Sequence, residues 1–166
     1  MLIVLGGLPG VGKTTIAREL ARSLGAAHVR IDSIELAIRE SGVTVASIDD
    51  AGYRVGYAVA EDNLRLGRWV IADSVNPLPV TRDGWLAVAT RAAVAIAEVE
   101  LRCSDTGEHR RRVEQRLAEL PPPGGPTWQD VLDRDYRAWD REHIVIETAG
   151  RSVDQILTGL RAMFCH

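Results

Sequence analysis

Short apolar runs alternate along the chain with longer segments in which apolar residues recur every three or four positions. Unbroken apolar runs are typical of buried parallel strands, and the longer periodicity is typical of helices that pack on one side. Strands are expected at residues 2–5, 28–31, 69–72, 94–101 and 143–146. Helices are expected around residues 16–24, 33–40, 47–67, 81–92 and 106–120, and after Thr127 and Ser152, which can cap them.

This alternation predicts an α/β fold, in which a five-stranded parallel sheet carries helices on both faces. Residues 1–166 are interpreted as a single three-layer domain, because 166 residues is the size of one ordinary domain. The stretch 121–126 is rich in proline and glycine but falls inside the alternation. It is therefore interpreted as a loop or hinge, not as a domain boundary.

A glycine-rich loop joins the first predicted strand to the first predicted helix. Residues 7–14 read Gly-Leu-Pro-Gly-Val-Gly-Lys-Thr and fit GxxxxGK[ST], the pattern of a phosphate-binding P-loop. In such a loop, backbone N–H groups and the helix N-terminus bind phosphate oxygens, the lysine reaches the β- and γ-phosphates, and the threonine hydroxyl ligates Mg²⁺. The alternative is a glycine-rich turn before an ordinary helix. The strand–loop–helix context favours ATP and Mg²⁺, bound by Gly10, Val11, Gly12, Lys13, Thr14 and Thr15.

Composition adds one observation about the loop and several about the whole chain. Lys13 is the only lysine, whereas the other 19 basic residues are arginines, so the compact charge of a lysine is expected to matter there. The net charge of −3 argues against a dedicated nucleic-acid binder, and no apolar stretch is long enough for a membrane span. Cys103 and Cys165 lack metal-ligand spacing, and no secretory signal is evident, so a cytoplasmic protein is expected.

Two aspartates follow predicted strands, Asp32 after the second and Asp73 after the third. Ligands of parallel α/β sheets lie beyond the carboxyl ends of the strands. We therefore expect both carboxylates to converge on the glycine-rich loop, although they are distant from it in sequence.

Several classes of P-loop protein can be excluded. A GTPase needs the guanine-binding motif Asn-Lys-x-Asp, and Lys13 is the only lysine. Motor ATPases need more chain to complete their site. A small phosphotransferase remains, closed by a mobile helical lid at about residues 105–127.

The sequence resembles the small P-loop kinases, an AAA_33-like group that includes chloramphenicol phosphotransferase, zeta toxins, polynucleotide 5′-kinase and gluconate kinase. The resemblance covers nearly the whole chain. It rests on the P-loop and on four shorter stretches, at residues 31–33, 73–76, 112–116 and 146–152.

The resemblance implies roles for individual residues around the P-loop. Asp32 would be the general base that takes the proton of the acceptor hydroxyl; a carboxylate that only caps the following helix is the alternative. Asp73 would bind either Mg²⁺ or the acceptor, unless it simply ends its strand. Asn76 would contact the acceptor, and Arg151 would flank the nucleotide.

Arginines on the predicted lid are candidates for catalysis. Arg112 and Arg116 lie one helical turn apart and share a face, from which they could offset charge on the transferred phosphoryl group. A solvated helix is the alternative, because Glu108 and Arg112 also form a favourable pair four residues apart. Arg110 and Arg111 are expected on that solvated side.

The acceptor side departs from part of the group. Polynucleotide kinases and zeta toxins carry an arginine three residues after the base aspartate, where this chain has Glu35. A carboxylate would repel an acceptor phosphate, so a neutral or amine-bearing small alcohol is the favoured acceptor and nucleic acid is less favoured. The alternatives are a 5′-hydroxyl polynucleotide kinase and a nucleotide-dependent switch or ATPase without an acceptor. The oligomeric state is left open.

Overall fold

Five strands form one parallel sheet in the computed structural model, which describes residues 1–42, 50–120 and 124–164. They are β1 (Leu2–Gly6), β2 (Ala27–Arg30), β3 (Val70–Asp73), β4 (Ile96–Arg102) and β5 (Ile144–Glu147). Their order across the sheet is β2-β3-β1-β4-β5, and every neighbouring pair is parallel. The predicted α/β class and the five predicted strands are confirmed, with small shifts at the strand ends.

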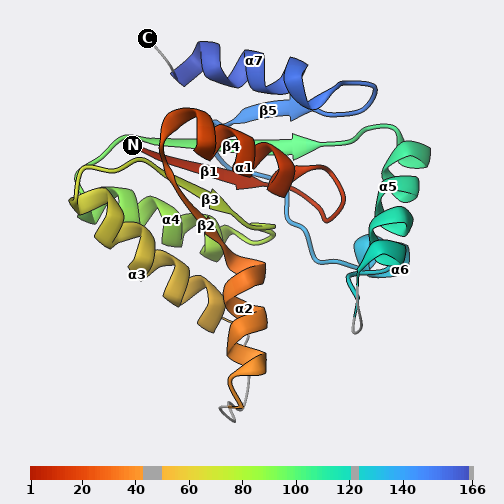
Figure 1. Ribbon diagram of the computed structural model, residues 1–166, viewed down its shortest axis with the longest axis horizontal. Coiled ribbons are helices and arrows are strands. Elements are labelled where there is room, and N and C mark those ends of the chain that lie inside the picture. The colour runs from red at the N-terminus through yellow and green to blue at the C-terminus, as the bar shows by residue number, and fades with distance from the viewer. Residues whose placement is uncertain (43–49, 121–123, 165–166) are drawn as a thin grey trace.

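Helices cover both faces of the sheet (Figure 1). Helices α1 (Lys13–Leu24) and α7 (Val153–Phe164) lie on one face, whereas α3 (Ala51–Arg65) and α4 (Pro79–Arg91) lie on the other. Each face has its own apolar core, and β1 between them is buried along its whole length. Helices α2 (Ile31–Glu40), α5 (Thr106–Glu119) and α6 (Trp128–Leu132) extend beyond the sheet.

Local sequence explains where several helices begin and end. Gly25 ends α1 in the left-handed conformation, with φ of 61°, as a C-terminal glycine does. Thr127 and Asp130 form a reciprocal capping box at the start of α6, which confirms Thr127 as a cap. Helix α4 begins earlier than expected, because Pro79 has the fixed φ that suits a first helical turn.

The predicted position of Asp32 at the end of a strand is wrong. Strand β2 ends at Arg30, and α2 begins at Ile31, so Asp32 lies in the first helical turn. The reason is packing, because Ile31 is buried in the core beneath α3, against Gly56. The apolar Ile31 therefore belongs to the helix and not to the strand.

Some expected features lie outside the described residues. They are residues 121–123 of the predicted lid, Ser47 at the predicted start of α3, and Cys165. Within the part of the chain that the structure describes, no helix is both long and apolar enough to cross a membrane.

Candidate functional site

The P-loop runs from the end of β1 into the first turn of α1, as its pattern predicts. Gly10 and Gly12 have positive φ angles of 85° and 100°, which side chains rarely allow, and Gly12 is the N-cap of α1. The first turn of α1 contains no acidic residue. The unpaired N–H groups at this helix start can therefore bind an anion without competition from a local carboxylate.

Helix α5 packs directly against this loop. The His109 ring Nε2 and the carbonyl oxygen of Pro9 are 2.7 Å apart, and a Cβ atom on Gly10 would lie 2.5 Å from Val113 Cγ2. Gly10 is therefore needed for space as well as for its backbone conformation. His109 was not expected at the site, and nothing in the local sequence distinguishes it from other polar residues of α5.

Lys13 is 8% exposed and its Nζ donates a hydrogen bond of 2.8 Å to the carbonyl oxygen of Leu8. Burial lowers the pKa of Lys13 to about 8, although the charges of Asp73 and Asp32 oppose this shift. Lys13 is thus a buried cation that interacts electrostatically with two carboxylates. Among the other nucleotide-binding candidates, Val11 is buried and Thr15 is exposed.

Asp73 is almost completely buried beside the P-loop and has partners on two elements. Burial alone would raise the pKa of Asp73, but hydrogen bonds from His28 and Thr14 and the charge of Lys13 outweigh it and lower the pKa. His28 Nε2 lies 3.2 Å from Asp73 Oδ2, and Arg30 Nε lies 3.8 Å from the same oxygen. The carboxylate is therefore ionised, which is the form that binds a cation.

The residues around Asp73 fit a magnesium–nucleotide complex. Thr14 and Asp73 supply a hydroxyl and a carboxylate in hydrogen-bond contact with one another. Within the described residues, no cluster of three or more His, Cys, Asp or Glu side chains could hold a metal ion by itself. One or two protein oxygens, completed by phosphate oxygens and water, are what Mg²⁺ takes in nucleotide-binding sites.

Asp32 and Glu35 lie on α2, and the charge of Asp32 acts on Lys13. The Asp32 side chain is 54% exposed, and its Oδ2 accepts a hydrogen bond of 3.1 Å from Arg30. Glu35 is more enclosed, and burial, followed by the charge of Asp32, raises the pKa of Glu35. Its Cγ would lie 2.4 Å from a Cβ atom on Gly52 of α3. The Glu35 side chain can therefore occupy this position only because Gly52 has no side chain.

Asn76 was expected to contact the acceptor, but the structure buries it completely. Its Oδ1 accepts a hydrogen bond from Trp85 Nε1, and its Nδ2 donates to the carbonyl oxygen of Leu5. With a φ of 51°, Asn76 instead fixes the turn that follows β3. Asparagine tolerates this conformation better than most residues, which accounts for its presence there.

Arg112 and Arg116 on α5 differ in their surroundings. Arg112 donates hydrogen bonds to Glu108 and to the backbone and side-chain oxygens of Thr148, at 3.0 and 3.1 Å for Thr148. Arg116 lies in a small cleft with Pro9 and Gly10, and its positive charge contributes to the low pKa of Lys13. The favourable pair with Glu108 is therefore present, while Arg116 has its charge directed at the P-loop.

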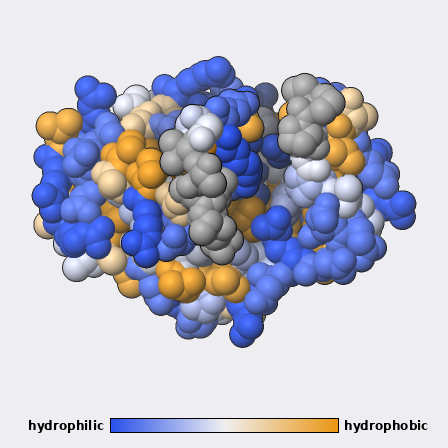
Figure 2. Space-filling view, turned by 90° about the horizontal axis from the view of Figure 1, so that it is seen from below, coloured by the Kyte–Doolittle hydropathy of each residue, from blue (hydrophilic) through white to orange (hydrophobic). Residues whose placement is uncertain are grey.

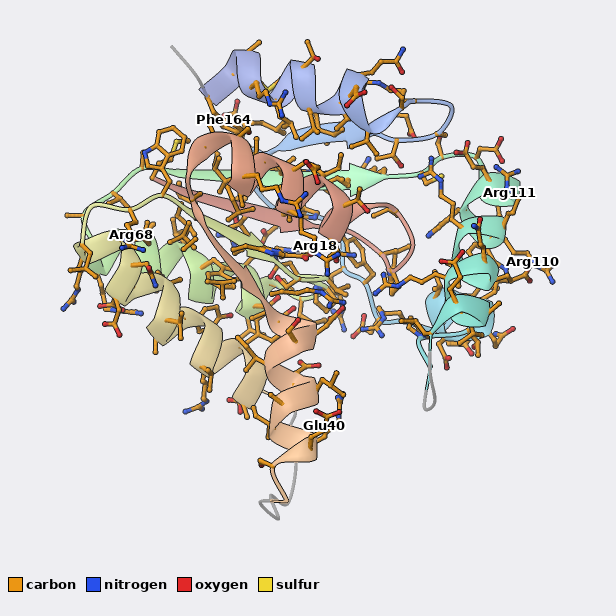
Figure 3. The ribbon with its side chains drawn as sticks, in the orientation of Figure 1. Arg18, Glu40, Arg68, Arg110, Arg111 and Phe164 are labelled. Atoms are coloured by element: carbon orange, nitrogen blue, oxygen red, sulfur yellow. The ribbon has the colours of Figure 1, made fainter. Side chains whose placement is uncertain are left out.

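Arg110 and Arg111 project from the outer side of α5, away from the sheet (Figure 3). Arg110 is exposed and pairs with Glu114 at 2.7 Å. Arg151, in the turn after β5, is also exposed and donates to the carbonyl oxygens of Glu147 at the end of β5 and Gln155 in α7. Its expected contact with the nucleotide remains a prediction, as do the roles of the lid arginines in transfer.

Two charged residues near the site were not expected. Arg134, just after α6, is close enough to Lys13 and Glu35 for its charge to affect the pKa of both. Arg30 at the end of β2 contacts both Asp32 and Asp73. The alternation of His28 and Arg30 was a usable signal for the contacts with Asp73, because residues two apart on a strand share a face. Arg134 lies in a mixed-charge stretch without such a signal.

The molecular surface supports an open site. The face seen in Figure 2 is hollowed between the side that carries α2 and the side that carries α5 and α6, and hydrophilic side chains predominate around the hollow. A broad hollow on this side is lined by Gly124, Gly125, Pro126, Asp130, Asp133 and Arg134. Its lining combines glycine and proline with three charged side chains, Asp130, Asp133 and Arg134.

Comparison with known proteins identifies relatives of the chain. Residues 2–123 match the model of the family AAA_33, described as an AAA domain. The match covers most of the chain, and its range contains the P-loop, Asp32, Asp73 and α5. Arg134 and the turn after β5 lie beyond it.

Solved structures share the fold over nearly their whole length. A kinase candidate from Chloroflexus aurantiacus has a TM-score of 0.77 at 17% identity, with 97% of this chain and 96% of that chain covered. The APS kinase CysC of Mycobacterium tuberculosis, solved with AMPPNP and APS, has a TM-score of 0.73 at 19% identity and coverages of 98% and 95%. A gluconokinase of Sinorhizobium meliloti has a TM-score of 0.64 at 20% identity and coverages of 96% and 89%. At these identities the likeness establishes the fold.

Proposed function

Because the chain belongs to the AAA_33 family of P-loop domains, we propose that it transfers the γ-phosphoryl group of ATP to a hydroxyl of a small molecule. The observation that carries this proposal is a second carboxylate beside the P-loop. Asp32 comes from a different element than Asp73, is more than half exposed, and acts electrostatically on Lys13. A protein that only binds a nucleotide as a switch has no need of such a base.

The chemistry assigns a separate task to each residue. The P-loop N–H groups and Lys13 bind the β- and γ-phosphates, and Thr14 and Asp73 would hold Mg²⁺, which would neutralise phosphate charge. Asp32 accepts the proton of the acceptor hydroxyl as its oxygen bonds to the γ-phosphorus. The bond between that phosphorus and the bridging oxygen breaks, and ADP leaves with the electron pair. Arg116 offsets negative charge on the transferred group.

The acceptor class follows from the surroundings of Asp32. Glu35 occupies this side of the site, and no arginine grips an acceptor phosphate three residues after Asp32. Two structural relatives are named as kinases of small molecules, APS and gluconate. These observations support a small hydroxyl compound over a nucleic-acid 5′ end.

The test measures ADP formation from ATP and Mg²⁺ with a panel of hydroxyl acceptors, using Lys13→Ala as the blank. The panel contains aminoglycoside-like amino alcohols, sugars, sugar acids, nucleosides and 5′-hydroxyl oligonucleotides. We expect one class of small molecule to raise the rate above the rate with water. Asp32→Asn should then reduce transfer about 100-fold or more and leave ADP affinity within about twofold. Stimulation by oligonucleotides alone, or equal loss of ADP affinity in Asp32→Asn, would contradict the proposal.

A further inference from the structure

Arg30 joins the two carboxylates of the site. Its Nη2 donates to Asp32 Oδ2 at 3.1 Å, its Nη1 donates to Ser33 Oγ at 3.3 Å, and its Nε lies 3.8 Å from Asp73 Oδ2. One guanidinium group therefore stands between the proposed base and the residue proposed to hold Mg²⁺. Nothing in the proposed transfer reaction yet uses it.

The sheet and the early start of α2 together produce this arrangement. Arg30 is paired with Asp73 across the β2–β3 ladder, so both side chains emerge at the same edge of the sheet. Helix α2 begins at the next residue, which brings Asp32 back over Arg30 within one turn. Had the strand continued to Ile31, Asp32 would have followed the strand direction away from this contact.

The contact with Arg30 replaces the ordinary use of an aspartate at a helix start. Such an aspartate commonly accepts a hydrogen bond from free backbone N–H groups. The N-cap of α2 is Arg30 itself, with no side-chain cap hydrogen bond, and the Asp32 carboxylate bonds instead to the guanidinium. Asp32 therefore does not cap α2 with its side chain.

The contact with Arg30 matters for the orientation of the Asp32 carboxylate, because the Asp32 side chain is largely exposed. The Asp32 side chain is 54% exposed, whereas the Arg30 side chain is 22% exposed. A free carboxylate at a half-exposed position samples several rotamers. Arg30, which lies deeper and also contacts Asp73, restricts this sampling and holds Asp32 Oδ2 next to the guanidinium.

The Nε atom of Arg30 is buried and has no hydrogen-bond partner in the described structure. An unsatisfied buried donor is unfavourable by about 1–3 kcal/mol, so it calls for an explanation. The nearest carboxylate oxygen, Asp73 Oδ2, already contacts His28 at 3.2 Å. The orientation of Arg30 thus favours its contact with Asp32 at the expense of a full hydrogen bond to Asp73.

We propose that Arg30 is a positioning residue that holds the Asp32 carboxylate by Oδ2, on the side facing Asp73, and leaves Oδ1 for the acceptor hydroxyl. This inference rests on the proposed function, because it gives Asp32 the role of base. Arginine does not lose its proton in proteins, so Arg30 acts as a fixed fork of donors and not as an acid or base. A lysine in its place would keep the charge but could not donate from two fixed nitrogen atoms to Asp32 and Ser33 at once.

The test is a double-mutant cycle on the transfer of phosphoryl to water, which needs no knowledge of the acceptor. Single-turnover hydrolysis of ATP with Mg²⁺ is measured with enzyme in excess for wild type, Arg30→Lys, Asp32→Asn and the double variant. We expect Arg30→Lys to slow hydrolysis about tenfold, because the base is displaced. In the Asp32→Asn background the same change should alter the rate less than about twofold, because no base remains to position.

The matched control is Arg22→Lys, which alters an exposed arginine that pairs with Glu19 on α1 away from the site. It should change neither the rate nor the affinity for metal-free ADP, and Arg30→Lys should also leave that affinity unchanged. A tenfold loss that recurs in the Asp32→Asn background would overturn the inference while sparing the proposed function. A wild-type rate no faster than that of Lys13→Ala, or an Asp32→Asn rate equal to wild type, would instead reject the proposed base and with it the role of Arg30.

Discussion

The nucleotide side proposed for the P-loop and the proposed acceptor side of the site are built in different ways. The nucleotide side is one continuous segment, residues 7–15, whose conformation depends on glycines and on the start of α1. The acceptor side brings together α2, the turn after β3 and the stretch 134–139, which are far apart in sequence. The first region offers mainly backbone N–H groups together with Lys13 and Thr14, whereas the second region offers side chains.

This difference determines how each region tolerates change. Phosphate oxygens meet backbone N–H groups, so the loop depends on conformation and on a few small residues. The acceptor side depends on contacts between side chains of distant segments. Gly52 leaves space for Glu35, and Arg82 binds the segment that follows α6. We therefore expect substitutions on the two sides to fail in different measurements.

The largest expected effect is a loss of stability when the hydrogen bonds of buried Arg82 are removed. Arg82 is completely buried, and no carboxylate lies within ion-pair distance of it in the described part of the chain. Its guanidinium donates to the carbonyl oxygens of Asn76, Pro77, Arg137 and Ala138 and lies 4.4 Å from the ring centre of Trp139. It thereby joins the turn after β3 to the segment that follows α6.

Arg82→Met removes these donors and leaves buried carbonyl groups unpaired. We expect the free energy of unfolding to fall by about 4 kcal/mol in a denaturant titration, because each unsatisfied group is unfavourable by about 1–3 kcal/mol. Arg22→Met is the control, and an exposed arginine–glutamate pair there should contribute about 1 kcal/mol or less. Equal losses in both variants would show that the carbonyl groups find other partners.

A smaller effect is expected from one methyl group on the nucleotide side. In Gly10→Ala the new Cβ would lie 2.5 Å from Val113 Cγ2, and the backbone would have to keep a φ of 85°. Strain and steric overlap should distort the loop and weaken ADP binding about 100-fold, which is about 2.7 kcal/mol. Calorimetric titration with ADP measures this loss. Unchanged affinity would mean that α5 moves aside and that the loop does not need this glycine.

The same change on the acceptor side should leave nucleotide binding intact. In Gly52→Ala the Cβ would lie 2.4 Å from Glu35 Cγ, but Gly52 lies inside α3 without a positive φ. Displacement of Glu35 should lower the free energy of unfolding by about 1–2 kcal/mol, and ADP affinity should stay within about twofold. A loss of ADP affinity as large as that of Gly10→Ala would remove the distinction between the two sides.

The two sides also differ in how much the sequence could predict. The P-loop, the five parallel strands and the convergence of Asp32 and Asp73 near Lys13 all follow from local patterns, because strands, glycines and the ends of parallel strands have position-specific requirements. Each of these predictions depends on neighbouring residues in the chain. The Asp32 position was off by one structural element, since the burial of Ile31 is a tertiary effect.

Features that depend on distant contacts could not be predicted in this way. Asparagine is a common ligand-binding residue, yet the side-chain amide of Asn76 is already hydrogen-bonded to Trp85 and Leu5. His109 and Arg134 approach the P-loop only because of how α5 and α6 return to it. Their local sequences contain charges on helices and loops, a pattern that is equally typical of a solvated surface.

The smallest expected effect is the uptake of a proton by Lys13 when ADP binds, which concerns the nucleotide side alone. Because burial lowers the pKa of Lys13 to about 8, part of this lysine is neutral at pH 8.5 in the free protein. Bound phosphates favour the charged form, so ADP binding at pH 8.5 should take up part of a proton, and affinity should fall as the pH rises above about 8. Calorimetry in two buffers of different ionisation enthalpy, without Mg²⁺, measures the uptake. Gly52→Ala should retain it, whereas the same uptake in Lys13→Ala would assign the proton to another group.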